Sequence, residues 1–174
     1  ARGDVLDALG ENRDTARLAP TFATTTLRFG VNEAVSHNII IPARLRVTGD
    51  FIHYFLTDQT VVLYAGQLYV EVGATAEKGG ADYNDAAIGE LSQIVDLSDV
   101  ALIDYVTNTE PTDGGGNQET DEAYRERIRE AENRLSTAGP EKAYRYWALS
   151  ANPIVTDAVV ESETERIKRT LKTY

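Results

Sequence analysis

The sequence predicts an α+β fold, in which a mostly antiparallel β domain precedes a helical region with two consecutive helices, a short strand and a final short helix. Three observations support this prediction. Residues 21–108 contain short alternating apolar stretches, separated by turn residues at the spacing of β-hairpins. Residues 120–151 instead repeat apolar residues every three or four positions, which is typical of helices. The charge balance changes at the same place, because residues 1–118 hold 7 Lys/Arg and 17 Asp/Glu whereas residues 119–174 hold 10 and 11.

These patterns divide the chain into four segments. We expect an N-terminal helix and connector over 1–20, the antiparallel β domain over 21–108, a glycine-rich linker over 109–119 and the helical region over 120–174. The first helix is predicted over 4–12, where Val5, Leu6 and Leu9 share one face and Gly10 can end it. The linker is predicted from its composition, since three consecutive glycines make a backbone flexible.

The expected strands of the β domain are short. Alternation, β-branched content and flanking turn residues predict them at 21–31, 38–47, 51–56, 60–64, 68–72 and 100–107. In the second of these, alternate residues from Ile39 to Val47 share one side, and Pro42 indicates a strand end or edge because proline cannot donate to the ladder. Residues 76–89 are predicted to form a long exposed loop, and 88–95 is ambiguous between a helical turn and a strand.

The helical region has recognisable start and stop signals. Thr120 is a good N-cap for its first helix, whose expected apolar face consists of Tyr124, Ile128, Ala131 and Leu135. A second helix is expected from Pro140, with an apolar face of Ala143, Tyr144, Trp147, Ala148 and Ala151. Residues 154–160 are predicted to be a strand. A capping box formed by Ser162 and Glu165 predicts the last helix.

The composition of the 174-residue chain excludes several function classes. A formal charge of −11 excludes nucleic-acid binding as a main role, because phosphate contacts need a concentrated basic face. The absence of cysteine removes disulfides, thiol nucleophiles and cysteine-ligated zinc. No apolar run approaches the ~20 residues of a membrane helix, so we expect no membrane insertion. The absence of methionine leads us to expect a fragment or a processed chain.

The sequence contains no motif for catalysis, for a cofactor or for a metal. The serine-hydrolase elbow, the P-loop and the dinucleotide fingerprint are all missing. His37 and His53 lie far apart and are expected to be surface or half-buried side chains. Residues 113–122 mix acids with glycines, but glycines stand where a calcium loop needs its next oxygen donors. Acid pairs such as Asp82/Asp85 and Asp96/Asp99 leave a hydrolase with two carboxylates as a third hypothesis.

The helical region holds the candidate interaction residues. Its arginines Arg125, Arg127, Arg129 and Arg134 are interleaved with glutamates, which favours intrahelical ion pairs on a solvated face over a phosphate site. Tyr146 is predicted to point away from the side of Tyr144 and Trp147, and an exposed aromatic there would anchor an interface. We expect the two helices to carry the partner contacts, with candidate residues Tyr124, Arg127, Tyr144, Tyr146 and Trp147.

Two stretches of this region resemble the baseplate J-like protein family. They are GGGNQETDEAYRERI at 114–128 and the segment 136–151, which opens with STAGP. The alternating residues at 155–160 fit the strand that follows in that family, and the β region is similar in a more general way. Family members are usually longer and continue with further strands where this chain is predicted to be helical, so we expect a truncated, short or joined version.

The resemblance implies a structural protein in the tail baseplate of a contractile phage, assembled in the host cytoplasm, or in the equivalent part of a contractile injection machine. Family members form wedges around the central hub and pair with copies of themselves and with other wedge proteins. The resemblance implies no enzymatic activity, no cofactor and no small-molecule substrate. The alternative hypothesis is an acidic carbohydrate- or surface-binding β module with a helical appendage, because exposed loops such as 76–89 can bind such ligands.

Overall fold

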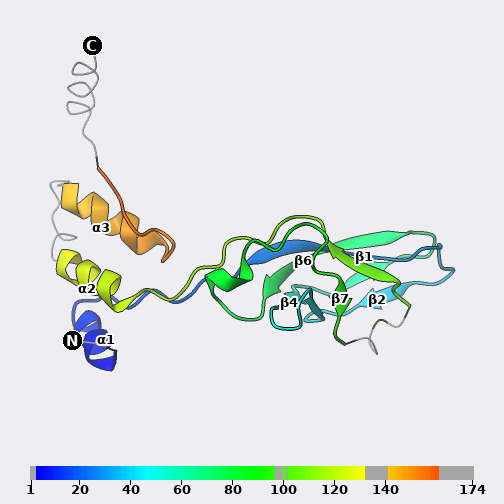
Figure 1. Ribbon diagram of the computed structural model, residues 1–174, viewed down its shortest axis with the longest axis horizontal. Helices are drawn as coiled ribbons and strands as arrows, with labels where there is room; N and C mark the ends of the chain where they lie inside the picture. The colour runs from blue at the N-terminus through cyan, green and yellow to red at the C-terminus, as the bar shows by residue number, and fades with distance from the viewer. Residues whose placement is uncertain (1–2, 97–99, 101, 132–140, 161–174) are drawn as a thin grey trace, which may run out of the picture. The chain divides into compact units, whose positions relative to one another are not determined.

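The computed structural model describes residues 3–96, 100, 102–131 and 141–160 (Figure 1). The chain folds as two compact units. Residues 20–117 form the first, here called the β unit, and residues 1–19 together with 118–174 form the second, the helical unit. The N-terminal helix therefore shares a unit with the helices at the other end of the sequence. No helix in the described ranges is long and apolar enough to cross a membrane.

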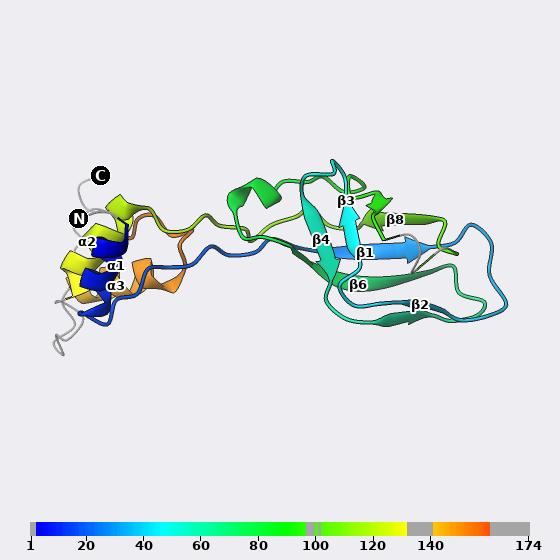
Figure 2. The same cartoon turned by 90° about the horizontal axis from the view of Figure 1, so that it is seen from below.

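The β unit is built from antiparallel strands, as the sequence predicts. They are β1 (Thr24–Gly30), β2 (Ile39–Ile41), β3 (Arg46–Thr48), β4 (Tyr54–Thr57), β5 (Val61–Leu63), β6 (Tyr69–Ala76), β7 (Gln93–Ile94) and β8 (Tyr105–Asn108). The main sheet has the order β7-β3-β4-β6-β1-β8, and β2 pairs with β5 separately. Because β7 also contacts β8, the sheet forms a nearly closed barrel. Figure 2 shows β1 running beside β6, its partner along the whole strand.

Alternation along the strands fills the interior of the β unit. In β1, Thr25, Leu27 and Phe29 are buried, whereas the residues between them are partly exposed. This is the two-residue period of a strand with one face on a core. Phe55 of β4 and Val72 of β6 belong to the same buried apolar cluster. The α+β fold class is thus confirmed.

The expected strand over 38–47 is divided at Pro42. β2 ends at Ile41 and β3 begins at Arg46, and the two strands lie in different sheets. The physical reason is that Pro42 has no N–H to donate to a ladder, so pairing cannot continue through it. We also expected alternate residues from Ile39 to Val47 to share one side. This prediction is wrong at Ala43, which is exposed.

The long loop and the glycine-rich segment are more ordered than their composition predicts. The loop over 76–89 contains the 3₁₀ helix η1 (Ala81–Tyr83), and the Tyr83 ring packs edge-on against His53 and Phe55. The glycine-rich segment forms isolated β-bridges from Gly116 to Thr21 and from Asp113 to Thr24, so it belongs to the β unit as far as Asn117. Backbone hydrogen bonds to Thr21 and Thr24 order this segment, which its glycines alone would leave flexible.

The helical unit contains α1 (Asp4–Glu11), α2 (Asp121–Glu130) and α3 (Glu141–Ala151). The N-cap prediction for α2 is confirmed, because Thr120 Oγ1 accepts a hydrogen bond from the backbone N–H of Ala123 at 3.3 Å. Of the face expected for α2, Tyr124, Ile128 and Ala131 are buried, and Tyr124 and Ile128 pack with Leu6 of α1. Leu135 lies outside the described residues.

The apolar face expected for α3 is wrong except at Ala143. Ala143 and Tyr146 are buried, whereas Tyr144 and Trp147 are each 59% exposed. Aromatic residues occur on both sides of this helix, so the helical period fits two faces equally well and cannot choose between them. The strand expected over 154–160 is also absent from the described residues 141–160, because a β-branched stretch becomes a strand only beside a neighbour with which it can pair. The predicted last helix lies outside the described residues.

Candidate functional site

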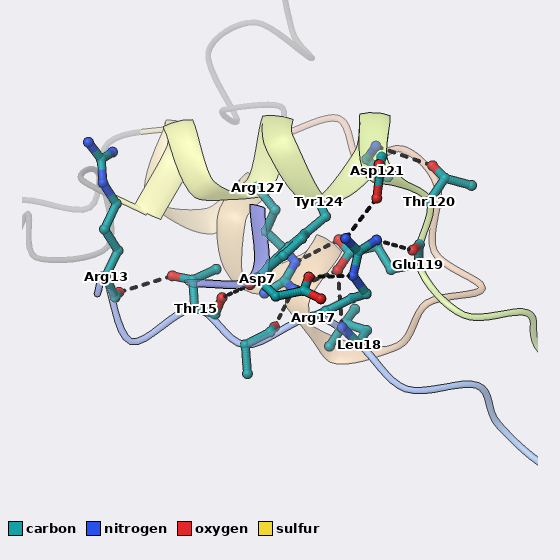
Figure 3. A network of polar contacts seen from close by, with 12 residues as sticks. Asp7, Arg13, Thr15, Arg17, Leu18, Glu119, Thr120, Asp121, Tyr124 and Arg127 are labelled. Carbon is teal, nitrogen blue, oxygen red and sulfur yellow. Dashed lines mark hydrogen bonds and ion pairs between the residues drawn. The ribbon is translucent and has the colours of Figure 1, made fainter. Parts of the chain in front are cut away.

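Arg127 and Glu119 form a buried ion pair in the helical unit, within a network of polar contacts (Figure 3). Their side chains are only 5% and 6% exposed. Nε of Arg127 donates to Oε1 of Glu119 at 2.8 Å and Nη2 donates to Oε2 at 2.7 Å, which gives a bidentate pair. Nη2 also donates to the carbonyl of Ala16 at 2.6 Å, and Oε2 accepts from the backbone N–H of Leu18 at 3.1 Å. The pair therefore fastens α2 to the connector that follows α1.

Arg17 ties the same connector to the start of both helices. Its guanidinium donates to Asp7 of α1 at 2.8 Å, to the Glu119 carbonyl at 2.9 Å and to Asp121 of α2 at 2.7 Å. Asp121 also accepts a hydrogen bond from the backbone N–H of Gly3 at 3.3 Å. These contacts, with the Arg17 hydrogen bond the stronger cause, hold the pKa of Asp121 below its ordinary value. A carboxylate in the first turn of α2 also suits the positive end of the helix dipole.

Tyr124 fills the space between these arginines. It is fully buried, and its hydroxyl donates to the carbonyl of Thr15 at 2.7 Å. The guanidinium carbons of Arg17 and Arg127 lie 4.7 Å and 5.4 Å from the centroid of its ring, within cation–π range. Gly10 makes this packing possible, because a Cβ there would stand 1.8 Å from the Tyr124 hydroxyl oxygen. Burial raises the pKa of the Tyr124 hydroxyl, which therefore stays protonated as a donor.

The chemistry of this network is structural. Its carboxylates accept hydrogen bonds from arginine or backbone N–H groups. Asp121, the carboxyl group of this network with a resolved pKa shift, has its pKa lowered by the Arg17 hydrogen bond, as expected of an acceptor in an ion pair. In the part of the chain that the structure describes, no three His, Cys, Asp or Glu side chains cluster closely enough to hold a metal ion. The arrangement suits the stabilisation of a small helical body.

The structure does not bring the five candidate interaction residues together on one surface. Tyr124, Arg127 and Tyr146 are buried within the chain, so Tyr146 does not form the exposed anchor expected of it. Its ring instead meets Trp147 edge-on at 5.2 Å. Tyr144 and Trp147 are the two candidates that remain accessible.

The arginines of α2 follow the sequence prediction in part. Arg125 lies 3.8 Å from Glu122 and Arg129 lies 3.1 Å from Glu126, and both are the expected intrahelical pairs at i,i+3. Arg127 is the exception, since its partner Glu119 precedes the helix. Arg134 lies outside the described residues. Sequence reasoning missed the roles of Glu119, Arg17 and Gly10 in this network. The period of α2 carries no signal for Glu119, which precedes the helix, and Arg17 and Gly10 are more than 100 residues away from the residues that they contact in the second half of the chain.

The histidines and acid pairs singled out from the sequence belong to the β unit. His53 Nδ1 lies 2.6 Å from Asp50, and His37 is exposed. Asp82 and Asp85 line a cavity of about 210 Å³ together with Asp50 and Glu90. Asp96 forms an ion pair with Arg46 at 2.8 Å, whereas Asp99 lies outside the described residues.

Comparison with known proteins gives a family match and several structural matches. A family model described as the baseplate J-like protein barrel domain matches residues 24–115. A chain in a cryo-EM structure of the anti-feeding prophage (AFP) baseplate, 6-fold symmetrised, is similar to this chain with a TM-score of 0.55 and 14% identity. The match covers 86% of this chain and 47% of that one, so this chain spans about half the length of its match. No curated protein sequence matches. The family match falls on the β unit, whereas the motifs that suggested the resemblance lie mainly at 114–157.

Proposed function

The chain belongs to the baseplate J-like protein family, and from this membership we propose that it is a structural wedge component of a contractile-tail baseplate. The family assignment supports a location in the baseplate of a contractile phage tail or a related injection machine. In this proposal the chain acts through protein–protein assembly around the hub, pairs with other wedge proteins and with copies of itself, and catalyses no reaction.

The single observation that carries the proposal is the family match over the barrel. The geometry of the helical unit is consistent with it, because strongly bonded groups such as Arg127 and Glu119 hold a rigid body rather than face a substrate. Rigid elements with complementary faces are what a repeating assembly needs.

The exposed side of α3 is the partner surface that we propose for the helical unit. Tyr144 and Trp147 stand one helical turn apart and both expose more than half of their surface. Tyrosine and tryptophan are the side chains most often found as interface hot spots, since they bury a large area at a low cost in conformational entropy. In this proposal the buried residues Tyr124, Arg127 and Tyr146 stabilise the packing of the helices that carry this surface.

The proposal is tested in the organism that encodes the chain. Deletion of its gene is expected to stop baseplate assembly, and the wild-type gene should restore complete particles in electron micrographs. Trp147→Ala with Tyr144→Ala is expected to leave the protein folded and to lower particle yield, whereas Tyr64→Ala, which changes an exposed tyrosine of the β unit, serves as a matched control. Normal baseplates from the deletion strain would refute the proposal. A purified chain that binds defined sugars on a glycan array would favour the carbohydrate-binding alternative.

A further inference from the structure

The hairpin between β3 and β4 carries an exposed apolar tip. Phe51 and Ile52 are 63% and 70% exposed and lie side by side in the turn between Asp50 and His53. Turn tips usually carry glycine, asparagine, aspartate or serine, whose backbone and side chains suit a solvated bend. Two adjacent large apolar side chains at such a tip therefore call for a physical reason.

The tip is held in one conformation by hydrogen bonds at its base. The Asp50 carboxylate accepts from the backbone N–H groups of Ile52 and His53, both at 2.8 Å. Thr48 Oγ1 accepts from the Phe51 N–H at 3.0 Å and donates to the His53 carbonyl at 2.8 Å. The Tyr54 hydroxyl donates to the Phe51 carbonyl at 2.7 Å. Because this turn is already ordered, its docking would lose little conformational entropy.

Phe51 adopts a left-handed backbone conformation, with φ of 60°. This region is disfavoured for a bulky side chain, and asparagine or glycine occupies it with less strain. Most of the Phe51 side chain is exposed to solvent, so packing in the core does not offset this backbone strain. Strain combined with exposure indicates that the residue serves an interaction outside the chain.

The charge around the tip indicates what kind of surface it meets. The neighbouring cavity is lined by Asp50, Asp82, Asp85 and Glu90. Over residues 20–117 the sequence holds 4 Lys/Arg against 13 Asp/Glu. Such a surface repels an anionic lipid headgroup layer and a second copy of the same unit, and it attracts a basic surface.

We propose that Phe51 and Ile52 dock into an apolar pocket, rimmed by Lys or Arg side chains, on another protein of the assembled machine. This inference rests on the proposed function for the statement that the chain acts by assembly. The proposed contact is separate from the α3 surface and lies on the β unit. Its centre is apolar, and the acidic side chains around it would pair with basic side chains of the partner.

The first test introduces Phe51→Asn together with Ile52→Ser into the chain in the organism that encodes it. Because asparagine tolerates the left-handed conformation, the melting temperature should stay the same or rise. The yield of complete particles should fall on the order of tenfold or more, as expected for loss of a hot spot. Ile40→Thr removes an equally exposed apolar side chain from β2 and should keep wild-type yield. A double variant that assembles as well as wild type would overturn the inference.

The second test identifies the partner surface. A photoreactive benzoylphenylalanine at position 51 in assembled particles should give an adduct with a different protein, at apolar residues that have Lys or Arg neighbours. An adduct with lipid, an adduct with a second copy of this chain, or a yield no higher than from the same probe at position 40 would each overturn the inference. If the wild-type chain is missing from purified baseplates, the proposed function itself fails, whereas normal baseplates that contain the double variant refute only this contact.

Discussion

Glu119→Ala should destabilise the helical unit far more than an ordinary loss of an ion pair. The substitution leaves the Arg127 guanidinium charged and buried, without the carboxylate that it contacts through two hydrogen bonds of 2.8 and 2.7 Å. Breaking one side of a buried pair costs about 3–5 kcal/mol, because the remaining charge stays desolvated. A domain has a total stability of about 5–15 kcal/mol, so this change removes a large share of it. With a urea m-value of about 1.5 kcal/mol/M, the unfolding midpoint should fall by about 2–3 M.

The assay uses the single tryptophan of the chain. Trp147 lies on α3, so its fluorescence during urea unfolding reports on the helical unit, while the β unit contributes no tryptophan signal. Two further variants set the scale. Glu126→Ala breaks the exposed pair with Arg129 and should cost only about 0–1 kcal/mol. Glu119→Leu with Arg127→Met removes both buried charges and should cost less than Glu119→Ala alone.

The reasoning is refuted if the free energy of unfolding of Glu119→Ala lies within about 0.5 kcal/mol of that of the Glu126→Ala control, since a buried unpaired charge should destabilise the unit by more than that. It also fails if the double variant is less stable than Glu119→Ala. In that case the pair would contribute through packing of Arg127 rather than through its charge.

Three further outcomes are expected for the helical unit. Gly10→Ala should cost about 1–3 kcal/mol in urea unfolding although alanine is the better helix former, because the new Cβ collides with the Tyr124 hydroxyl. Thr120→Ala should cost about 1 kcal/mol through loss of the N-cap, with faster hydrogen exchange in the first turn of α2 as the readout. The lowered pKa of Asp121 means that its stabilising contribution is present above the unfolded pKa near 3.8 and is lost as pH falls through the lower folded value. Asp121→Asn should therefore flatten the decline in stability as the pH falls below the unfolded pKa, and an unchanged acid profile would contradict the role of its Arg17 bond.

Prediction from sequence succeeded where a single element carries its own signal. β1 was predicted because Leu27 and Phe29 alternate with polar residues, and that period fixes which side chains face a core. The start of α2 was predicted because Thr120 can cap a helix in any context. The family was found through motifs at 114–157, and the match over the barrel confirms it from a different part of the chain.

Prediction failed where contacts outside a residue's own helix or segment determine its environment. Arg127 was expected on a solvated face, because its neighbours in sequence are glutamates, yet its partner is Glu119 and its other acceptor is the Ala16 carbonyl. Tyr146 was expected to be exposed, because the helical period alone fits two faces of α3. The glycine-rich segment was expected to be a linker, because composition does not show that Gly116 bonds to Thr21.

The sequence by itself determined the fold class, the strand and helix periods, the cap of α2 and the acidic character of the β unit. These are properties of neighbouring residues, and steric and solvation preferences over a few positions decide them. Only the tertiary structure decided that α1 packs with α2, although the whole β unit separates them in the sequence, that Arg127 is buried, and that Phe51 is held left-handed at an exposed tip. The first two features depend on contacts between segments more than 100 residues apart, such as the hydrogen bond from Arg127 to the Ala16 carbonyl, whereas the Phe51 turn is held by hydrogen bonds to Thr48 and Tyr54. The stability of all three comes from desolvation and hydrogen bonds that exist only after the chain folds.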